Sequence, residues 1–331
     1  MNTTKYLSCE KRFNVLSLFD GISCGYQALN EAGVNVSKYY ASEVDKYAIS
    51  VAKANHPYII ELGDVTRWRE WDIDWKSIDL LIGGSPCQGF SNAGQKLNFA
   101  DPRSKLIFCF FDILEHIKNL NPSVKFLLEN VRMKKKWKAV IDEKTGVEGV
   151  LINSNLFSAQ NRDRIYWTNL EIRDLPTHND AVISDIIEDG ADENEKLYLS
   201  EKHLAGFNRS YKFKPGKRTE KSRTITRSYF KRPYNVTYIP HNNGNADDKY
   251  SEYRMLSPVE CERLQTLPDD YTAFGVDGEI ISNTQRYKML GNGWTVAVIK
   301  FLFQDLAPKQ PNEDRRAAEV PIECFAETIS A

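Results

Sequence analysis

The chain has 331 residues, of which 41% are hydrophobic and 27% charged, and its formal net charge is -1. This length exceeds one average domain and predicts a large core with a smaller appended region. No apolar run approaches the roughly 20 residues that cross a bilayer, and residues 1–14 lack the features of a secretion signal, so we expect a cytoplasmic protein with no membrane partner.

The six cysteines are scattered along the chain, with no CxxC pair and no Cys/His spacing suited to zinc. We therefore expect reduced thiols and no metal. The nearly balanced charge does not by itself indicate a nucleic-acid partner, because a balanced total can hide a local basic face. The distribution of charge along the chain is therefore informative.

Between residue 13 and about residue 170, short apolar runs alternate with helical patterns, which is typical of βαβ units around a largely parallel sheet. Near-continuous apolar runs at residues 13–19, 78–82 and 124–128 predict three strands buried on both faces. Between the last two, apolar residues recur at helical spacing from Leu106 to Leu120 and predict a helix that packs on the sheet. The sequence thus predicts an α/β fold.

Beyond residue 170 the composition changes. The stretch 209–232 holds ten Lys or Arg against a single acid, Glu220, with aromatic residues interleaved. This suits a surface that meets phosphates and bases, but a solvated, loop-rich face explains it equally well. Apolar periodicity resumes at Ser257, residues 295–306 are expected to form a helix, and the polar tail after residue 308 is expected to be disordered.

The turn after the first predicted strand has glycines where a backbone must approach a nucleotide-like ligand closely. A purely steric use of glycine in such a turn is an equally good explanation. Glu43 ends the apparent second strand, at the position where an acid in such folds binds ribose hydroxyls. Together the two features favour an adenosine-containing cofactor, and a dinucleotide oxidoreductase would share them.

The segment 83–90, GGSPCQGF, follows a buried strand and should lie at the carboxyl edge of the sheet, where open α/β folds bind ligands. A free cysteine is usually a small buried hydrophobe. Cys87, in a polar Gly/Pro-rich loop, is instead a candidate nucleophile, because an accessible thiol can ionise and attack.

Glu129 closes the strand at 124–128, so its carboxylate should emerge at the same edge as Cys87. Its alternative role is that of an ordinary acid bonding a helix N-terminus. Arg162 and Arg164 precede an apolar run and would supply fixed guanidinium donors. The alternative for them is a weakly stabilising surface ion-pair strip.

Taken together, these motifs resemble those of the cytosine-5 DNA methyltransferase family, and they occur in the same order as in that family, from about Val15 to Leu306. The matching segments are FDGIS, SEVD, GDV, GGSPCQGFS, LLENV, QNRDR, LQTLP and LGN. Several stretches, including IGGSPC and the Trp294 after LGNG, are closer still to the de novo branch of the animal enzymes. Because barely a dozen residues precede the first strand, we expect a stand-alone microbial or viral member.

The resemblance implies a Rossmann-like sheet of the S-adenosylmethionine-dependent methyltransferases with a small, irregular target recognition domain. The implied boundaries are 1–172 and 254–307 for the catalytic domain, 173–253 for target recognition and 308–331 for the tail. Cys87 would add to C6 of a cytosine flipped out of double-stranded DNA. Glu129 would bind N3 and the exocyclic amine, and Arg164, supported by Arg162, would hold O2 and the catalytic loop.

The resemblance also implies S-adenosylmethionine as the methyl donor, although many bacterial members have GNS where this chain has GNGW. The cofactor residues that it implies are Phe19, Asp20, Gly21, Ile22, Ser23, Glu43, Asp64, Val65, Asn292, Gly293 and Trp294. The expected DNA contacts are Gln88, Ser91, Arg223, Thr224, Thr226, Arg227 and Lys231. The protein could also form a homo-oligomer, which these residues neither require nor exclude.

Two other functions stay open at this point. An RNA cytosine methyltransferase would share the catalytic core, although the long basic region and the GGSPCQGFS loop favour DNA. A catalytically inactive DNA-binding homologue would typically lose the nucleophile or the acid, whereas both Cys87 and Glu129 are present.

Overall fold

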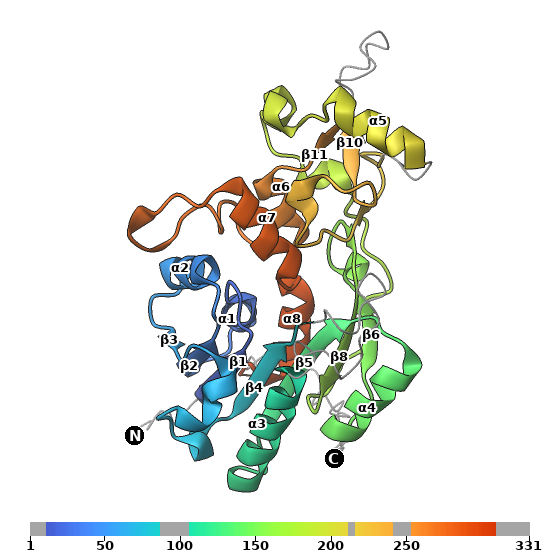
Figure 1. The fold of residues 1–331 in the computed structure, drawn as a ribbon. Helices are drawn as coiled ribbons and strands as arrows, with labels where there is room; N and C mark the ends of the chain where they lie inside the picture. Colours follow the sequence, from blue (N-terminus) through green and yellow to red (C-terminus); the bar gives the residue numbers. More distant parts are fainter. Residues whose placement is uncertain (1–10, 87–105, 211–215, 241–252, 309–331) are drawn as a thin grey trace, which may run out of the picture.

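The core of the molecule is a seven-stranded sheet with its strands in the order β3-β2-β1-β4-β5-β8-β6 (Figure 1). The structure, a computed structural model, describes residues 11–86, 106–210, 216–240 and 253–308. The strands of the sheet are β1 (Phe13–Leu18), β2 (Val36–Ser42), β3 (Ile60–Glu61), β4 (Leu80–Gly84), β5 (Lys125–Val131), β6 (Val150–Asn153) and β8 (Asp163–Thr168).

The first five strands of this order pair in parallel, which confirms the predicted βαβ character. β8 runs antiparallel to both of its neighbours, β5 and β6. Pairing with β8 carries β5 past its predicted end to Val131, so Glu129 lies inside the strand, opposite Tyr166. The prediction that Glu129 closes the strand was therefore wrong by two residues.

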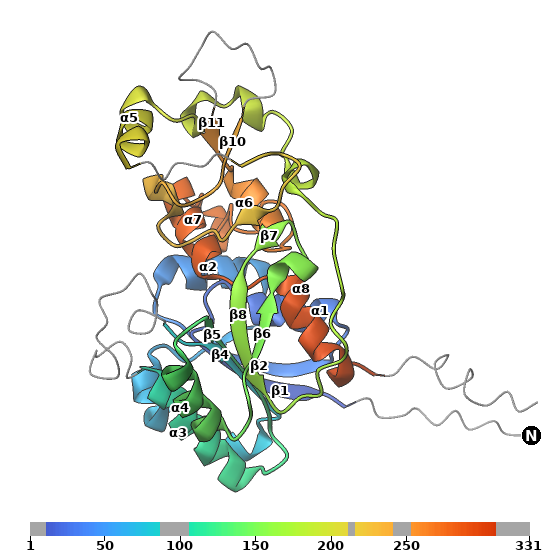
Figure 2. The same ribbon diagram turned by 90° about the vertical axis from the view of Figure 1, so that its right-hand side faces the viewer.

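Side chains of the central strands alternate between the two faces of the sheet, as the pleat requires. On β1, Val15 packs on one face and Leu16 on the other. One face is covered by α1 (Cys24–Glu31), α2 (Lys46–Asn55) and α8 (Val296–Phe303). The other is covered by α3 (Leu106–Leu120) and α4 (Lys135–Thr145) (Figure 2). Both faces are therefore buried, as the apolar runs predicted.

The predicted helices and strands differ from the observed ones mainly at their ends. The predicted strand at 78–82 is displaced to Leu80–Gly84, because Ile78 still caps a 3-10 turn at Trp75–Ser77. The helix expected at 295–306 is α-helical over Val296–Phe303 and ends in a 3-10 turn, Gln304–Leu306. The helix at 106–120 is confirmed as α3.

A second region of short elements stands beyond the sheet, at the top of Figure 1. We call residues 173–292 the upper region. It contains several 3-10 turns together with α5 (Glu201–Ser210), β9 (Ser222–Arg223), the antiparallel pair β10 (Tyr238–Pro240) and β11 (Tyr253–Met255), α6 (Pro258–Leu264) and α7 (Asn283–Asn292). β9 pairs with β7 (Gln160–Asn161) and so joins this region to the sheet's last hairpin.

The start of α6 shows why apolar periodicity resumes at Ser257. Ser257 accepts a hydrogen bond from the Glu260 N–H, Glu260 bonds back to the Ser257 N–H, and Pro258 occupies the first helical turn. These are the features of a capping box with an N-terminal proline. In the part of the chain that the structure describes, no helix is long and apolar enough to cross a membrane.

Candidate active site

A cavity of about 600 Å³ opens at the carboxyl ends of β1, β2, β4 and β5 and extends to the turn between α7 and α8. We call it the site cavity. Of the predicted cofactor residues it is lined by all but Ser23, namely Phe19, Asp20, Gly21, Ile22, Glu43, Asp64, Val65, Asn292, Gly293 and Trp294. Glu129, Arg162 and Arg164 line the same cavity. The structure therefore brings together residues that are up to 275 positions apart, from Phe19 to Trp294.

The loop after β1 has an unusual backbone. Phe19 and Ser23 have φ angles of 58° and 59°, in the left-handed region that residues with a side chain rarely adopt. The Asp20 carboxylate ties the loop together by accepting hydrogen bonds from the hydroxyls of Ser23, Ser17 and Tyr39. Burial raises the pKa of Asp20 to about 6, although these hydrogen bonds oppose the shift. Ser23, which is buried and does not line the site cavity, thus holds the loop through its bond to Asp20.

Glu43 is held just beyond β2 by three backbone N–H groups. Its Oε2 accepts from Gly21 at 2.9 Å, and its Oε1 accepts from Val44 at 2.8 Å and Asp45 at 2.9 Å. A carboxylate has about four acceptor sites, so about one remains for a ligand hydroxyl. The side chain is therefore pre-positioned while it still faces the site cavity.

Asp64 and Val65 line the wall next to Glu43. The Asp64 carboxylate caps a 3-10 turn by accepting from the Thr66 N–H at 2.9 Å. Val65 is buried and packs against the α3 side of the sheet. This wall offers one carboxylate and one apolar surface.

Glu129 is a buried carboxylate, 7% exposed, that is held from two sides. Arg164 Nε lies 2.9 Å from Glu129 Oε1, and the Trp294 indole Nε1 donates to Glu129 Oε2 at 2.9 Å. Arg164 reaches Glu129 diagonally, because Val131 is its direct partner across β5 and β8. Charge-assisted hydrogen bonds of this kind are roughly twice as strong as neutral ones.

Arg162 is 2% exposed and donates to main-chain carbonyls of three residues. Its guanidinium bonds Ile225 O at 3.0 Å, Gly293 O at 2.8 Å and Gly291 O at 3.3 Å. Burial lowers its pKa to about 9, so at neutral pH the group keeps its charge. Arg162, the residue before β8, thus links the start of that strand to the upper region and to the turn before α8.

Cys87, Gln88 and Ser91 lie outside the described residues. The stem that leads to them is anchored at Ser85, which is 6% exposed. Asn130 Nδ2 donates to Ser85 Oγ at 2.9 Å. In the sequence Asn130 stands out only as part of the LLENV motif, which does not by itself predict a role for it. An amide next to a candidate acid, at the same sheet edge as a Gly/Pro-rich loop, is the signal that points to it.

Cys24 also lines the site cavity, at the start of α1. Burial raises its pKa to about 12, which leaves almost no thiolate at neutral pH. Cys24 is therefore unsuited to nucleophilic attack.

Comparison with known proteins identifies the family. A profile for C-5 cytosine-specific DNA methylases matches residues 13–307. The type II methyltransferase M1.ScrFI of Lactococcus lactis subsp. cremoris is 30% identical over 326 residues, covering 87% of this chain and 76% of that protein. The chain belongs to this family.

Bacterial and phage proteins are among the relatives of this methyltransferase. The type II methyltransferase M.NlaX of Neisseria lactamica is 29% identical over 89% of this chain and 96% of its own length. The orphan methyltransferase M.Rho11sI of Bacillus phage rho11s is 36% identical over 61% of this chain and 41% of its own length. These matches confirm the predicted enzyme, a DNA (cytosine-5)-methyltransferase.

Solved structures confirm the fold of the methyltransferase. The Entamoeba histolytica methyltransferase EhMeth superposes with a TM-score of 0.70 at 19% identity, covering 90% of this chain and all of that one. The Schizosaccharomyces pombe Dnmt2 methyltransferase superposes with a TM-score of 0.68 at 18% identity, covering 89% and 98%. The predicted methyltransferase-like sheet is therefore correct.

The predicted DNA contacts that the structure describes differ in whether their side chains face the site cavity or contact other parts of the protein. Arg227 is exposed and lines the site cavity, together with Lys288, which the sequence did not single out. The Thr224 hydroxyl instead donates to Asn161 O at 2.7 Å. Arg223 Nη1 lies 3.5 Å from Val236 O, the Thr226 hydroxyl pairs with Ser228, and Lys231 Nζ lies 5.7 Å from the centre of the Phe230 ring.

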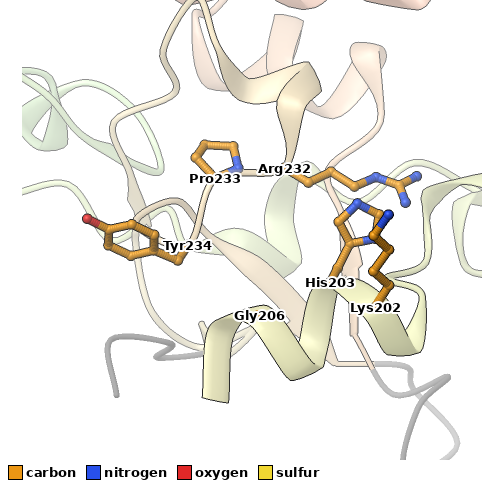
Figure 3. Close-up of a pocket in the computed structure, with 6 residues that line it drawn as sticks. All are labelled: Lys202, His203, Gly206, Arg232, Pro233 and Tyr234. Carbon is orange, nitrogen blue, oxygen red and sulfur yellow. The ribbon is translucent and has the colours of Figure 1, made fainter. Parts of the chain in front are cut away.

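A second pocket of about 530 Å³ lies on the upper region of the methyltransferase (Figure 3). Lys202 and His203 of α5 meet Arg232 there, and Tyr234 stands nearby. None of the predicted site residues lines this pocket. Within the described ranges, no group of three or more His, Cys, Asp or Glu side chains is arranged to hold a metal ion.

Proposed function

We propose that this methyltransferase transfers a methyl group from S-adenosylmethionine to C5 of a cytosine flipped out of double-stranded DNA, through a bond between Cys87 Sγ and cytosine C6. The observation that carries the proposal is Glu129, a buried carboxylate held by Arg164 and Trp294 in the wall of a cavity whose rim leads into the Cys87 loop. A buried, hydrogen-bonded acid is suited to stabilise charge that develops on a ring.

The residues of the site cavity fit the proposed methyl donor. A volume of about 600 Å³ lies within the usual range for a small-molecule site. Glu43 retains about one acceptor site for a ribose hydroxyl, and Asp20 and Asp64 add negative charge near a cationic cofactor. When bound, S-adenosylmethionine would supply an electrophilic methyl group, and the residues proposed to hold it line the same cavity as Glu129.

Cys87 and Glu129 would divide the work on the cytosine ring. The Cys87 thiolate forms an S–C6 bond, and the electron pair displaced from the C5–C6 double bond makes C5 nucleophilic. Glu129 holds N3 and the exocyclic amine and favours protonated N3, which offsets the charge pushed into the ring. After C5 takes the methyl group, with S-adenosylhomocysteine as the other product, loss of the C5 proton to a base restores the C5–C6 double bond and expels the Cys87 thiolate.

We further propose that residues 173–253 recognise the DNA target and that residues 254–307 return to the catalytic domain. Arg223, Thr224, Thr226, Arg227 and Lys231, with Gln88 and Ser91 of the catalytic loop, remain the proposed DNA contacts. Bacterial and phage relatives support a microbial or viral origin. The similarity to the animal de novo branch stays a prediction.

Methyl transfer from labelled S-adenosylmethionine to duplex DNA tests the proposal. Cys87→Ala should abolish both methyl transfer and the covalent complex with a duplex that contains 5-fluorocytosine, because both need the Cys87 thiolate. In the wild type that complex persists, because the analogue carries fluorine at C5 in place of the proton whose loss would release Cys87. Cys109→Ala, in which a partly exposed thiol on α3 is removed, should retain both activities. Transfer of label to RNA alone, or wild-type rates in Cys87→Ala, would refute the proposal.

A further inference from the structure

Trp294 donates a hydrogen bond to Glu129 and also lines the cavity proposed to hold the cofactor. The two residues are 165 positions apart, yet the indole Nε1 lies 2.9 Å from Glu129 Oε2. We propose that Trp294 is a positioning residue of the methyl-transfer reaction, which holds the Glu129 carboxylate in the orientation that meets the cytosine. The inference rests on the role proposed above for Glu129.

The sheet is built so that this contact can form. Gly84 lies directly opposite Glu129 in the register of β4 and β5. A Cβ at Gly84 would lie 2.7 Å from Trp294 Nε1, closer than real Cβ contacts come, and 3.0 Å from Glu129 Oε2, which is a tight contact. The missing side chain therefore leaves the space in which the indole N–H meets the carboxylate.

The other edge of the indole ring lies near Gly25 of α1 and beside a backbone held by Arg162. A Cβ at Gly25 on α1 would lie 3.4 Å from Trp294 Cζ3 and 2.5 Å from Ile82 Cδ1. Arg162 binds the Gly293 carbonyl, which fixes the backbone next to Trp294. Gly84 and the buried Arg162 thus help to determine where the ring lies, whereas the close neighbour of Gly25 is Ile82.

Two donors on different oxygens define the plane of the Glu129 carboxylate. Arg164 holds Oε1 and Trp294 holds Oε2. Each oxygen has a second lone pair, so both can still accept hydrogen bonds from a base. Indole is rigid and donates through one N–H, so it restrains the acid without adding charge to the pocket. Loss of that donor would free the carboxylate to rotate.

Trp294 also lines the site cavity, so its alternative role is a contact with the cofactor alone. The two roles predict different kinetic effects when the indole N–H is removed. If the ring only packed against a bound ligand, removing the N–H while keeping an aromatic ring would affect mainly binding of that ligand. If the N–H positions Glu129, the same change affects mainly the chemical step. The two roles are therefore separable by the kinetic constants.

The test compares Trp294→Phe with the wild-type methyltransferase. We expect kcat to fall about ten- to a hundredfold, as for loss of a hydrogen bond to a charged group, while KM for S-adenosylmethionine changes less than about threefold. Binding of S-adenosylhomocysteine and the thermal melting curve should stay close to wild type, which shows that the variant is folded. Trp71→Phe is the matched control, because within the described residues its indole N–H has no hydrogen-bond partner.

A double-mutant cycle with Glu129→Gln completes the experiment. In that background Trp294→Phe should lower kcat little further, because both changes disrupt one unit. An unchanged kcat for Trp294→Phe, or the same fold-loss in both backgrounds, would overturn the inference while leaving the role of Glu129 intact. Full activity of Glu129→Gln would instead refute the proposed role of Glu129 and this inference with it.

Discussion

The carboxyl edge of the sheet and the upper region both hold charged side chains by hydrogen bonds, but the two regions satisfy these charges differently. At the sheet edge, Glu43 and Glu129 are held by a few donors and still face a cavity. In the upper region Arg254 and Glu260 are 0% exposed and bond each other through two hydrogen bonds. The carboxylates that face the cavity keep acceptor sites for a ligand, whereas the buried charges of the upper region use their hydrogen-bonding groups on one another.

The upper region needs such a network because it has little regular structure. Asp192 lies on a 3-10 turn and joins the network by pairing with Arg218 at 2.7 Å and Arg254 at 2.7 Å. These bonds lower the pKa of Asp192, although burial alone would raise it. At the sheet edge burial prevails instead and raises the pKa of Asp20 to about 6. The two regions should therefore respond oppositely to acid.

The largest effect is expected for Arg254→Met. This change leaves the buried Glu260 without its guanidinium partner, while Asp192 keeps Arg218, and breaking a buried ion pair in this way costs about 3–5 kcal/mol. Urea unfolding should show this loss in the free energy of unfolding. A loss confined to the upper region should also appear as faster proteolysis there than in the sheet.

Arg173→Met is the matched control for that experiment. Its pair with Asp305 is exposed, with 51% and 32% of the side chains accessible, so its removal should cost about 0–1 kcal/mol. Equal losses in the two variants would show that the upper network is no more important than a surface pair.

A smaller effect is expected at the sheet edge, where acidification should raise the free energy of unfolding through Asp20. A raised pKa means that folded Asp20 contributes stability fully below its ordinary value of 3.8 and loses it as pH rises through about 6. Relative to Asp20→Asn, the wild type should therefore gain about 2 kcal/mol as pH falls from 7 to 4. Urea unfolding of both proteins across this range measures the gain, and parallel pH curves would contradict it.

Asp192 should produce the reverse trend in a separate window. Its lowered pKa stabilises the fold above the ordinary value of 3.8, and that contribution is lost as pH falls through the lower, folded value. The gain from Asp20 should thus come first on acidification, before the upper network fails.

Local patterns predicted the sheet edge well. β1, α3 and β5 follow from apolar periodicity, and their ends place the Asp20 loop and Glu129 at one edge. The contact between Trp294 and Glu129 could not be predicted in this way. It depends on Gly84 leaving room for an indole ring that comes from a distant part of the chain.

The upper region was less predictable for the same physical reason. Its basic stretch looked uniform in sequence, yet Arg218 is paired with Asp192, and Lys221 Nζ donates to the carbonyls of Ser158 and Ala181. No periodicity distinguishes these residues from Arg227, which is exposed at the cavity. Which cation is available to a ligand depends on partners distant in the chain.

Arg227 should show the smallest effect, and it sharpens the distinction between the two kinds of charge. Within the described residues its side chain makes no hydrogen bond or ion pair, so Arg227→Ala should leave stability nearly unchanged. If it contacts a DNA phosphate, the slope of log binding constant against log salt should fall by about 1. Lys38→Ala, exposed on β2, should leave that slope unchanged. An unaltered slope in Arg227→Ala would mean that exposure at the cavity does not make a charge available to DNA.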